Sequence, residues 1–207
     1  MEAKGGNTVE LKNNLDGMRA LLRDRIGRSV ELKQTLLKDE HFQGLVMQVA
    51  MRIAKSLEQG GKVFFFGNGG SAADAQHLAA EFTGRFLKER RPLPALALSV
   101  NSSSLTAIGN DYGFDIVFAR QLEALGKEGD VAVGISTSGN SPNVIRALET
   151  AHSKSIFSVA LTGKSGGTMK NIADCTICIP SEETPRIQEC QILTGHLICE
   201  LVEEVLF

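Results

Sequence analysis

The stretch that decides the fold is residues 63–85, VFFFGNGGSAADAQHLAAEFTGR. It opens with four apolar residues, and a short apolar run that ends in glycines predicts a buried β-strand. The glycines predict a turn whose backbone amides can approach a ligand closely. Ser71 is a candidate N-cap for the helix that follows, and a helix N-terminus can bind an anion. This one stretch therefore predicts a strand, an anion-binding turn and a helix with ionisable groups.

Apolar runs and helical stretches alternate through the rest of the chain. The predicted strands are 63–66, 95–99, 131–136, 157–161 and 175–179. Each run is unbroken, which is typical of strands that are buried on both faces of a parallel sheet. The helices predicted between and after them are 71–87, 103–125, 141–154, 166–172 and 185–206. The alternation predicts an α/β protein, a three-layer sandwich with a five-stranded parallel sheet between two layers of helices.

Two amphipathic helices are predicted before the first strand, at about residues 11–37 and 41–57. Apolar residues recur in both at spacings of three and four. Gln59-Gly60-Gly61 would end the second helix, as glycine commonly does. Because the chain shows no Pro-rich or Ser-rich linker, charge block or internal repeat, we expect one domain over residues 1–207. The N-terminal helices, residues 1–60, would cover the sheet or contribute to oligomer packing.

Composition narrows the class of protein. Of 207 residues, 43% are hydrophobic and 22% are charged, which is ordinary for a globular protein. A formal net charge of -2 gives no reason to expect nucleic acid or an acidic membrane surface as a partner. Since no apolar run approaches the length of a signal peptide or a membrane span, we expect a cytoplasmic protein. The four cysteines lie between Cys175 and Cys199 and are expected to be reduced thiols, not a structural zinc site.

Polar loops that contain glycine follow the first, third and fourth predicted strands, at 67–71, 136–141 and 162–167. The carboxyl ends of parallel strands meet at one edge of a sheet, where such proteins bind ligands. The second loop carries four hydroxyl residues and precedes Pro142 at a helix start. It therefore predicts a phosphate site in preference to an ordinary capped turn. It lacks the second glycine of a nucleophile elbow and is not a Walker loop.

A partial dinucleotide fingerprint is present as Gly67-x-Gly69-x-x-Ala72. The full fingerprint also needs an acidic residue near the end of the second strand, which holds the ribose. Residues 97–102 contain neither Asp nor Glu. The turn therefore fits a small ligand better than a dinucleotide.

His77 and Glu81 are four residues apart on the helix after the glycine turn, so they share a face. Such a pair can hold a metal ion, carry out acid–base chemistry or form an ordinary surface pair. His196 lies within an apolar helix, where a lone histidine is more often a core residue. Gln188 gives no signal by itself, and residues 110–113 have the composition of a turn.

Taken together, the motifs resemble those of the phosphoheptose isomerases, enzymes built on a sugar-isomerase (SIS) domain. The residues that carry the resemblance are 67–71, His77, Glu81, 83–85, 109–111, 134–141, 186–189 and His196. They span nearly the whole chain, from about residue 20 to the end. The resemblance implies a flavodoxin-like sheet, one zinc ion per subunit and a homotetramer with sites at subunit interfaces.

The resemblance also implies an isomerase reaction. D-sedoheptulose 7-phosphate and D-glycero-D-manno-heptose 7-phosphate interconvert through an enediol, as the first step toward ADP- or GDP-heptose for lipopolysaccharide or related glycans. The implied zinc ligands are His77, Glu81, Gln188 and His196, of which Glu81 and His196 also form the acid–base pair. The implied substrate-binding residues are Asn68, Gly69, Gly70, Ser71, Glu81, Asn110, Asp111, Ser136, Thr137, Ser138, Ser141 and Gln188.

Two positions depart from the family pattern. Pro185 stands where some relatives have an acidic residue, and Gln191 stands where many have a histidine; we expect both to tune activity only. The main alternative is a non-catalytic SIS-domain tetramer that binds the bacterial replication initiator. Such relatives lack the catalytic carboxylate and histidine, whereas this chain has Glu81 and His196. A regulator that senses sugar phosphates is a second alternative, but it would need an attached DNA-binding domain.

Overall fold

A single parallel sheet lies at the centre of the protein. This computed structural model describes the backbone of residues 6–207 and the side chains of residues 14–207. The strands are β1 (Val63–Gly67), β2 (Ala95–Ala97), β3 (Val131–Ser136), β4 (Phe157–Gly163) and β5 (Cys175–Ile179). They lie in the order β2-β1-β3-β4-β5, and each neighbouring pair is parallel. The predicted five-stranded parallel sheet is confirmed.

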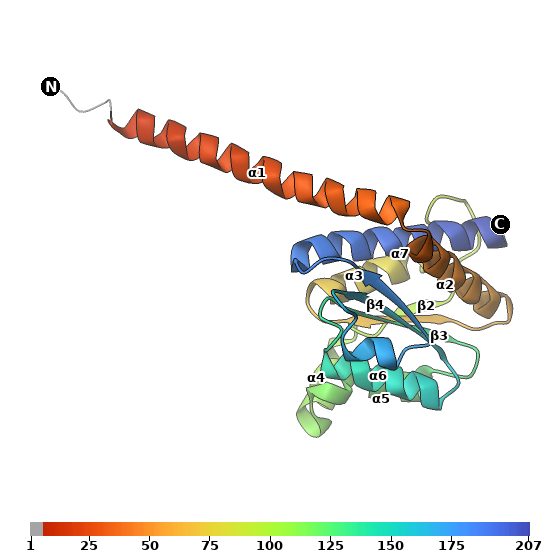
Figure 1. Cartoon of the computed structure of the whole chain (residues 1–207). Helices are drawn as coiled ribbons and strands as arrows, with labels where there is room; N and C mark the ends of the chain where they lie inside the picture. Colours follow the sequence, from red (N-terminus) through yellow and green to blue (C-terminus); the bar gives the residue numbers. More distant parts are fainter. Residues whose placement is uncertain (1–5) are drawn as a thin grey trace. The chain divides into compact units, whose positions relative to one another are not determined.

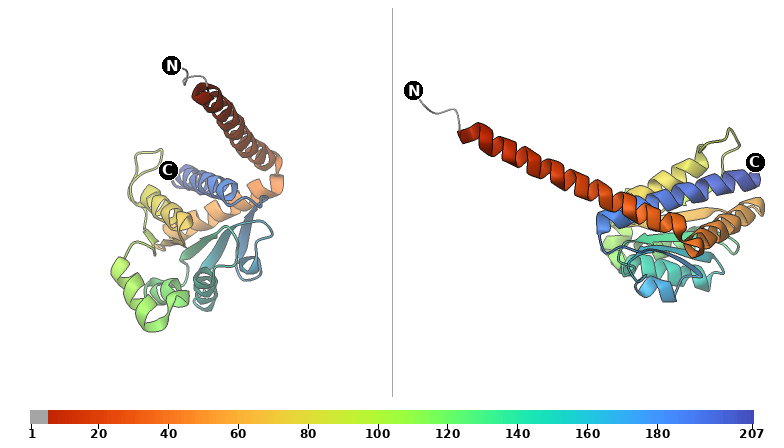
Figure 2. Two further views of the ribbon diagram at one scale, coloured as in Figure 1. Left: turned by 90° about the vertical axis from the view of Figure 1, so that its left-hand side faces the viewer. Right: turned by 45° about the horizontal axis from the view of Figure 1, so that its top comes forward.

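Helices cover both faces of this sheet (Figures 1 and 2). One face carries α2 (Glu40–Glu58), α3 (Gly70–Thr83) and α7 (Thr184–Leu206). The other face carries α4 (Ser102–Tyr112), α5 (Val117–Leu125) and α6 (Pro142–Ser153). Two short 3-10 turns are η1 (Phe114–Ile116) and η2 (Thr168–Asn171). The three-layer α/β sandwich is therefore confirmed.

Helix α1 (Gly6–Lys38) forms one compact unit, and residues 39–207 form another. Apolar side chains recur along α1 at spacings of three and four, and the following are 48 to 63% exposed: Leu15, Met18, Leu22, Ile26 and Val30. The single domain over residues 1–207, of which 1–5 lie outside the described residues, stays a prediction. The role of residues 1–60 in oligomer packing also stays a prediction. Within the described part of the chain, none of the helices has both the length and the apolar character of a membrane span.

The phenylalanines of β1 explain why its apolar run is unbroken. Successive side chains on a strand point to opposite faces of the sheet. Phe64 and Phe66 join the core cluster under α5 and α6, and the Phe66 ring lies 5.7 Å from that of Phe118 on α5. Phe65 points to the other face, where its ring centroid is 5.8 Å from that of Phe82 on α3. Both helix layers thus pack on this one strand.

Several predicted boundaries differ from the structure; for example, β4 runs two residues beyond the predicted 157–161, and the helix predicted at 166–172 is the 3-10 turn η2. The strand predicted at 95–99 ends at Ala97, and the Leu96 side chain is partly exposed because β2 is an edge strand. The helix predicted at 103–125 is divided by Gly113, whose φ of 95° lies in a region that favours glycine. The helix predicted at 71–87 ends at Thr83, where a loop begins.

The strand order places two of the predicted ligand loops side by side. From β1 the chain first adds β2 on one side and then returns to add β3 on the other. In parallel sheets of this kind, ligands bind where the order reverses, at the carboxyl ends of the strands. The glycine turn follows β1 and the serine-rich loop follows β3. The topology therefore brings these two loops to the same edge.

The buried carboxylate of Asp130 anchors the opposite, amino edge of the sheet. It is fully buried and accepts hydrogen bonds from Lys62 N (2.9 Å), Lys62 Nζ (2.7 Å) and Lys127 N (3.0 Å). Asp130→Ala would leave these donors without their acceptor, so we expect the free energy of unfolding to fall by about 3 kcal/mol. Urea denaturation at matched protein concentration measures this change.

Glu149→Ala is the control, because it removes only the exposed Arg146–Glu149 ion pair of 3.0 Å. Its effect should stay below about 1 kcal/mol. Equal and small losses in the two variants would show that Asp130 does not anchor the sheet edge.

Candidate active site between α3 and α7

The glycine turn after β1 starts α3 one residue earlier than predicted. Gly69 is the N-cap, with a φ of 54° that favours glycine, and the helix begins at Gly70. Ser71 is therefore not the N-cap but a buried residue of the first helical turn. It packs so tightly on the strand end that a Cβ at Gly67 would lie 2.8 Å from the Ser71 Cβ. The turn is thus built by glycines, as the sequence indicated, but Ser71 packs in it instead of capping the helix.

Two other glycines allow α7 to approach α3 closely. A Cβ at Gly70 would lie 2.5 Å from Nε2 of Gln188, so the Gln188 amide lies directly on the glycine turn. A Cβ at Gly195 would lie 2.5 Å from a methyl carbon of Leu78, which is 1% exposed. Real Cβ atoms essentially never come this close to other atoms. The two helices can therefore pack at this distance only because these positions have no side chain.

This contact brings together three of the four predicted metal ligands. His77 and His196 flank the contact, and their Nε2 atoms are 2.9 Å apart. Glu81 Oε1 lies 3.4 Å from Nε2 of His77. The ligand atoms of all three side chains lie within 4.8 Å of one another. The lone histidine of α7, which from the sequence could have been a core residue, is half-buried beside its partners.

The three side chains fit a divalent metal ion. Two imidazole nitrogens and one carboxylate oxygen are donors that zinc prefers. Burial lowers the pKa of His196 below its ordinary value, His77 lowers it further, and Glu81 acts in the opposite direction. The neutral imidazole, which is the form that binds metals, is therefore favoured. The group could thus hold a metal ion.

Asp74 adds an unpaired acceptor next to this group. It lies on α3 one turn before His77, and among the described residues its buried Oδ2 has no hydrogen-bond partner. Burial raises the pKa of Asp74, although the nearby His77 lowers it. An unpaired buried oxygen is costly unless a ligand or a water satisfies it. A polar ligand bound in the site would satisfy this Asp74 oxygen.

The serine-rich loop after β3 forms a cluster of hydroxyls. Ser136 Oγ lies 2.9 Å from Ser141 Oγ and 3.4 Å from Ser138 Oγ. Ser141 is the N-cap of α6, and Pro142 lies in its first turn, which confirms the helix start predicted there. The cluster therefore lies at a helix N-terminus, where backbone amides and the helix dipole favour an anion.

The third polar loop, residues 162–167, packs against the serine-rich loop. Gly139 and Gly166 pack backbone against backbone, because a Cβ at Gly139 would lie 2.0 Å from the Gly166 carbonyl oxygen. The Asn140 side chain accepts hydrogen bonds from N and Oγ1 of Thr168, both at 2.9 Å. The Thr137 carbonyl also accepts one from Gly163 N, at 3.1 Å. These contacts fix the conformation of the hydroxyl cluster.

Comparisons with known proteins point to one family. Residues 30–163 match the SIS domain family. The chain is 56% identical over 177 residues to the phosphoheptose isomerase of Aquifex aeolicus, covering 86% of this chain and 92% of that protein. It is 51% identical over 190 residues to that of Aneurinibacillus thermoaerophilus, covering 92% and 96%. The solved phosphoheptose isomerase from Neisseria gonorrhoeae is 43% identical with a TM-score of 0.85, covering 90% and 99%.

The chain belongs to the phosphoheptose isomerase family of SIS domain proteins. The resemblance deduced from the motifs is thereby confirmed. Of the residues that carry the resemblance to phosphoheptose isomerases, those on α3 and α7 meet in this chain. Asn110 and Asp111 lie on α4, which covers the other face of the sheet. These two lie exposed in the last turn of α4, where the Asn110 amide donates a 2.8 Å hydrogen bond to Asp111.

The sequence analysis did not identify Asn143, which connects the glycine turn to the helix after the serine-rich loop. Its amide exchanges two hydrogen bonds with the amide of Asn68, at 2.8 and 2.9 Å. Asn143 is 2% exposed and lies in the first turn of α6, so the pair joins the glycine turn to the helix after the serine-rich loop. A polar residue on the buried face of an amphipathic helix was the available signal.

Gly195→Ala tests whether the close helix contact builds the metal group. The added methyl would push α7 away from Leu78, at an overpacking cost of roughly 1–3 kcal/mol. We expect the zinc affinity to fall at least about tenfold, as when the support of a ligand is removed. Competition with a chromogenic chelator measures the affinity.

The double variant Gly195→Ala with Leu78→Ala makes room for the methyl and should recover most of the zinc affinity. Gly44→Ala is the matched control on α2, since apart from the neighbouring residues and the local helix backbone no described atom lies within 4 Å of a Cβ there. A folded Gly195→Ala protein with unchanged zinc affinity would contradict the role of this contact.

Proposed function

We propose that this protein interconverts D-sedoheptulose 7-phosphate and D-glycero-D-manno-heptose 7-phosphate. The single observation that carries the proposal is the meeting of His77, Glu81 and His196 at one point between α3 and α7. Relatives that are 51 and 56% identical are phosphoheptose isomerases. The product would enter the synthesis of ADP- or GDP-heptose for lipopolysaccharide or a related glycan.

The substrate phosphate is held by the serine-rich loop. Its hydroxyl donors are Ser136, Thr137, Ser138 and Ser141, together with Ser71 at the start of α3. The hydroxyl cluster at the N-terminus of α6 supports this assignment, because an anion is favoured there. The sugar is held by the glycine turn, Asn68, Gly69 and Gly70. Asn110 and Asp111, which lie exposed at the end of α4, are the further sugar-binding positions that the resemblance implies.

The metal ion is zinc, one per subunit, held by His77, Glu81, Gln188 and His196. Support comes from the donor set of His77, Glu81 and His196. When bound, zinc supplies a Lewis acid that polarises the sugar carbonyl.

Proton transfer is carried out by Glu81 and His196. The aldose loses the proton on C2 while the oxygen on C1 gains one, which gives the enediol. C1 then gains a proton and the oxygen on C2 loses one, which gives the ketose. Glu81 moves the proton between the carbons, and His196 assists ring opening or proton transfer at the oxygens. A carboxylate and a neutral imidazole are suited to these roles near neutral pH.

The active form is a homotetramer whose sites lie at subunit interfaces. The exposed apolar stripe of α1 supports this, because a stripe with helical spacing is typical of a helix that packs on a partner. The non-catalytic alternative, a tetramer that binds the replication initiator, is disfavoured because both proton-transfer residues are present and adjacent to His77.

Turnover of sedoheptulose 7-phosphate tests the proposal directly. We expect conversion to the aldose with zinc present, loss of conversion after chelation, and recovery when zinc is added back. Glu81→Gln should lower kcat by about 10²–10⁴-fold, because it removes the general base. A coupled assay or NMR of the sugar measures both.

Glu149→Gln, on the exposed face of α6, is the matched control and should leave kcat unchanged. Absence of conversion by the zinc-loaded protein would favour the non-catalytic alternative. Full activity of Glu81→Gln would contradict the site assignment.

A further inference from the structure

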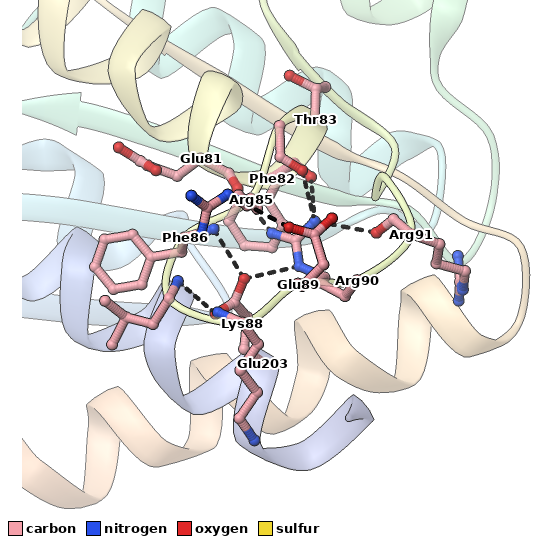
Figure 3. A network of polar contacts seen from close by, with 12 residues as sticks. Glu81, Phe82, Thr83, Arg85, Phe86, Lys88, Glu89, Arg90, Arg91 and Glu203 are labelled. Carbon is pink, nitrogen blue, oxygen red and sulfur yellow. Dashed lines mark hydrogen bonds and ion pairs between the residues drawn. The ribbon is translucent and has the colours of Figure 1, made fainter.

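The loop that follows α3, residues 84–92, is held by a buried ion pair. Arg90 Nε lies 2.8 Å from Glu203 Oε1, and each side chain is only 2% exposed. Figure 3 shows the guanidinium and the carboxylate facing each other inside the loop. The loop residues themselves are exposed or half-buried. Apolar burial therefore contributes little to holding this loop, and the ion pair is its main anchor.

Glu203 binds the loop backbone directly. Its two carboxylate oxygens accept hydrogen bonds from the backbone N–H groups of Phe86 (2.9 Å), Leu87 (2.8 Å) and Lys88 (2.9 Å). Burial alone would raise the pKa of Glu203, but these three bonds and the bond from Arg90 lower it below its ordinary value. The carboxylate is thus ionised, and three successive amides converge on it. Such convergence restricts the backbone conformation of residues 86–88.

Arg90 binds the end of α3. Nη2 donates to the Glu81 carbonyl at 2.8 Å, and Nη1 lies 2.9 Å from the Phe82 carbonyl and 3.1 Å from that of Gly84. The last carbonyls of a helix have no partner within the helix, and a cation there is favourable. Arg90 therefore fixes the turn of α3 that carries Glu81.

The same loop places an aromatic ring against His196. The rings of Phe86 and His196 are stacked, with centroids 5.5 Å apart and an interplanar angle of 28°. The Phe86 backbone is held by Glu203, which lies on α7 two turns after His196 and so on the same face. One carboxylate thus fixes the ring that restricts rotation of the His196 imidazole.

We propose that Arg90 and Glu203 are positioning residues of the active site, which act through Phe86 on His196 and through the end of α3 on Glu81. A buried ion pair is in itself weak support for stability, because desolvation offsets much of its attraction. Here it makes hydrogen bonds next to two of the three metal-binding side chains. The effect on turnover rests on the proposed function, whereas the effect on the orientation of His196 and on zinc affinity does not.

Arg90→Lys tests the proposal, because lysine keeps the charge but a single ammonium cannot serve both Glu203 and the α3 carbonyls. In the metal-free folded protein, we expect the NMR signals of the His196 ring to shift from their wild-type positions. We also expect about tenfold weaker zinc binding, the usual effect when a residue that orients a ligand is lost. In the isomerase assay, kcat should fall by a similar factor with little change in KM.

Two further variants separate positioning from a purely structural role. Glu204→Gln is the matched control, because it removes an exposed 2.9 Å ion pair between α7 and Lys88 of the same loop; it should leave zinc affinity and kcat unchanged. Phe86→Leu keeps the ion pair but removes the stacked ring, and it should weaken zinc binding as Arg90→Lys does. If Arg90→Lys fails to fold, the zinc affinity of Phe86→Leu tests the proposal instead.

A folded Arg90→Lys protein with wild-type His196 signals and wild-type zinc affinity would overturn the proposal. Unchanged zinc affinity in Phe86→Leu would overturn the path through Phe86. If the wild-type protein does not turn over the heptose phosphate, the proposed function fails, but the His196 signals and the zinc titrations still decide the role of the ion pair.

Discussion

The close approach of α7 to α3 is the constraint on which the candidate site depends. At Gly195 the two helices are so near that one added carbon would lie 2.5 Å from Leu78. Because His77 and His196 flank this contact, it determines the distance between their imidazoles. The metal-binding group is therefore a consequence of backbone packing between two distant segments, with glycine as the residue that makes the packing possible.

The rest of the site is built around this contact from both helix layers. The metal-binding group lies on the face of α3 and α7, whereas the hydroxyl cluster lies at the start of α6, on the other side of the sheet. The reversal of strand order between β1 and β3 brings the glycine turn at the start of α3 and the serine-rich loop to one edge. The reciprocal amide pair of Asn68 and Asn143 bridges them.

Much of this fold could be predicted from the sequence, because strands buried on both faces leave unbroken apolar runs. The bounds of β3 and β5 agree with the predicted ones. The shared face of His77 and Glu81 follows from their spacing alone, but spacing cannot show that His196 meets them. That required the resemblance, because the contact depends on how two helices pack. Arg90 and Glu203 gave no signal, since the sequence does not distinguish a buried ion pair from two surface charges.

A crystal structure of the protein loaded with zinc, with anomalous data collected at the zinc edge, tests the central claim most directly. The account predicts one anomalous peak per subunit between α3 and α7. Bonds of about 2.0–2.2 Å should join it to Nε2 of His77, Nε2 of His196 and the carboxylate of Glu81. A peak that binds none of these three side chains, or separated histidines with no peak between them in zinc-saturated crystals, would contradict it.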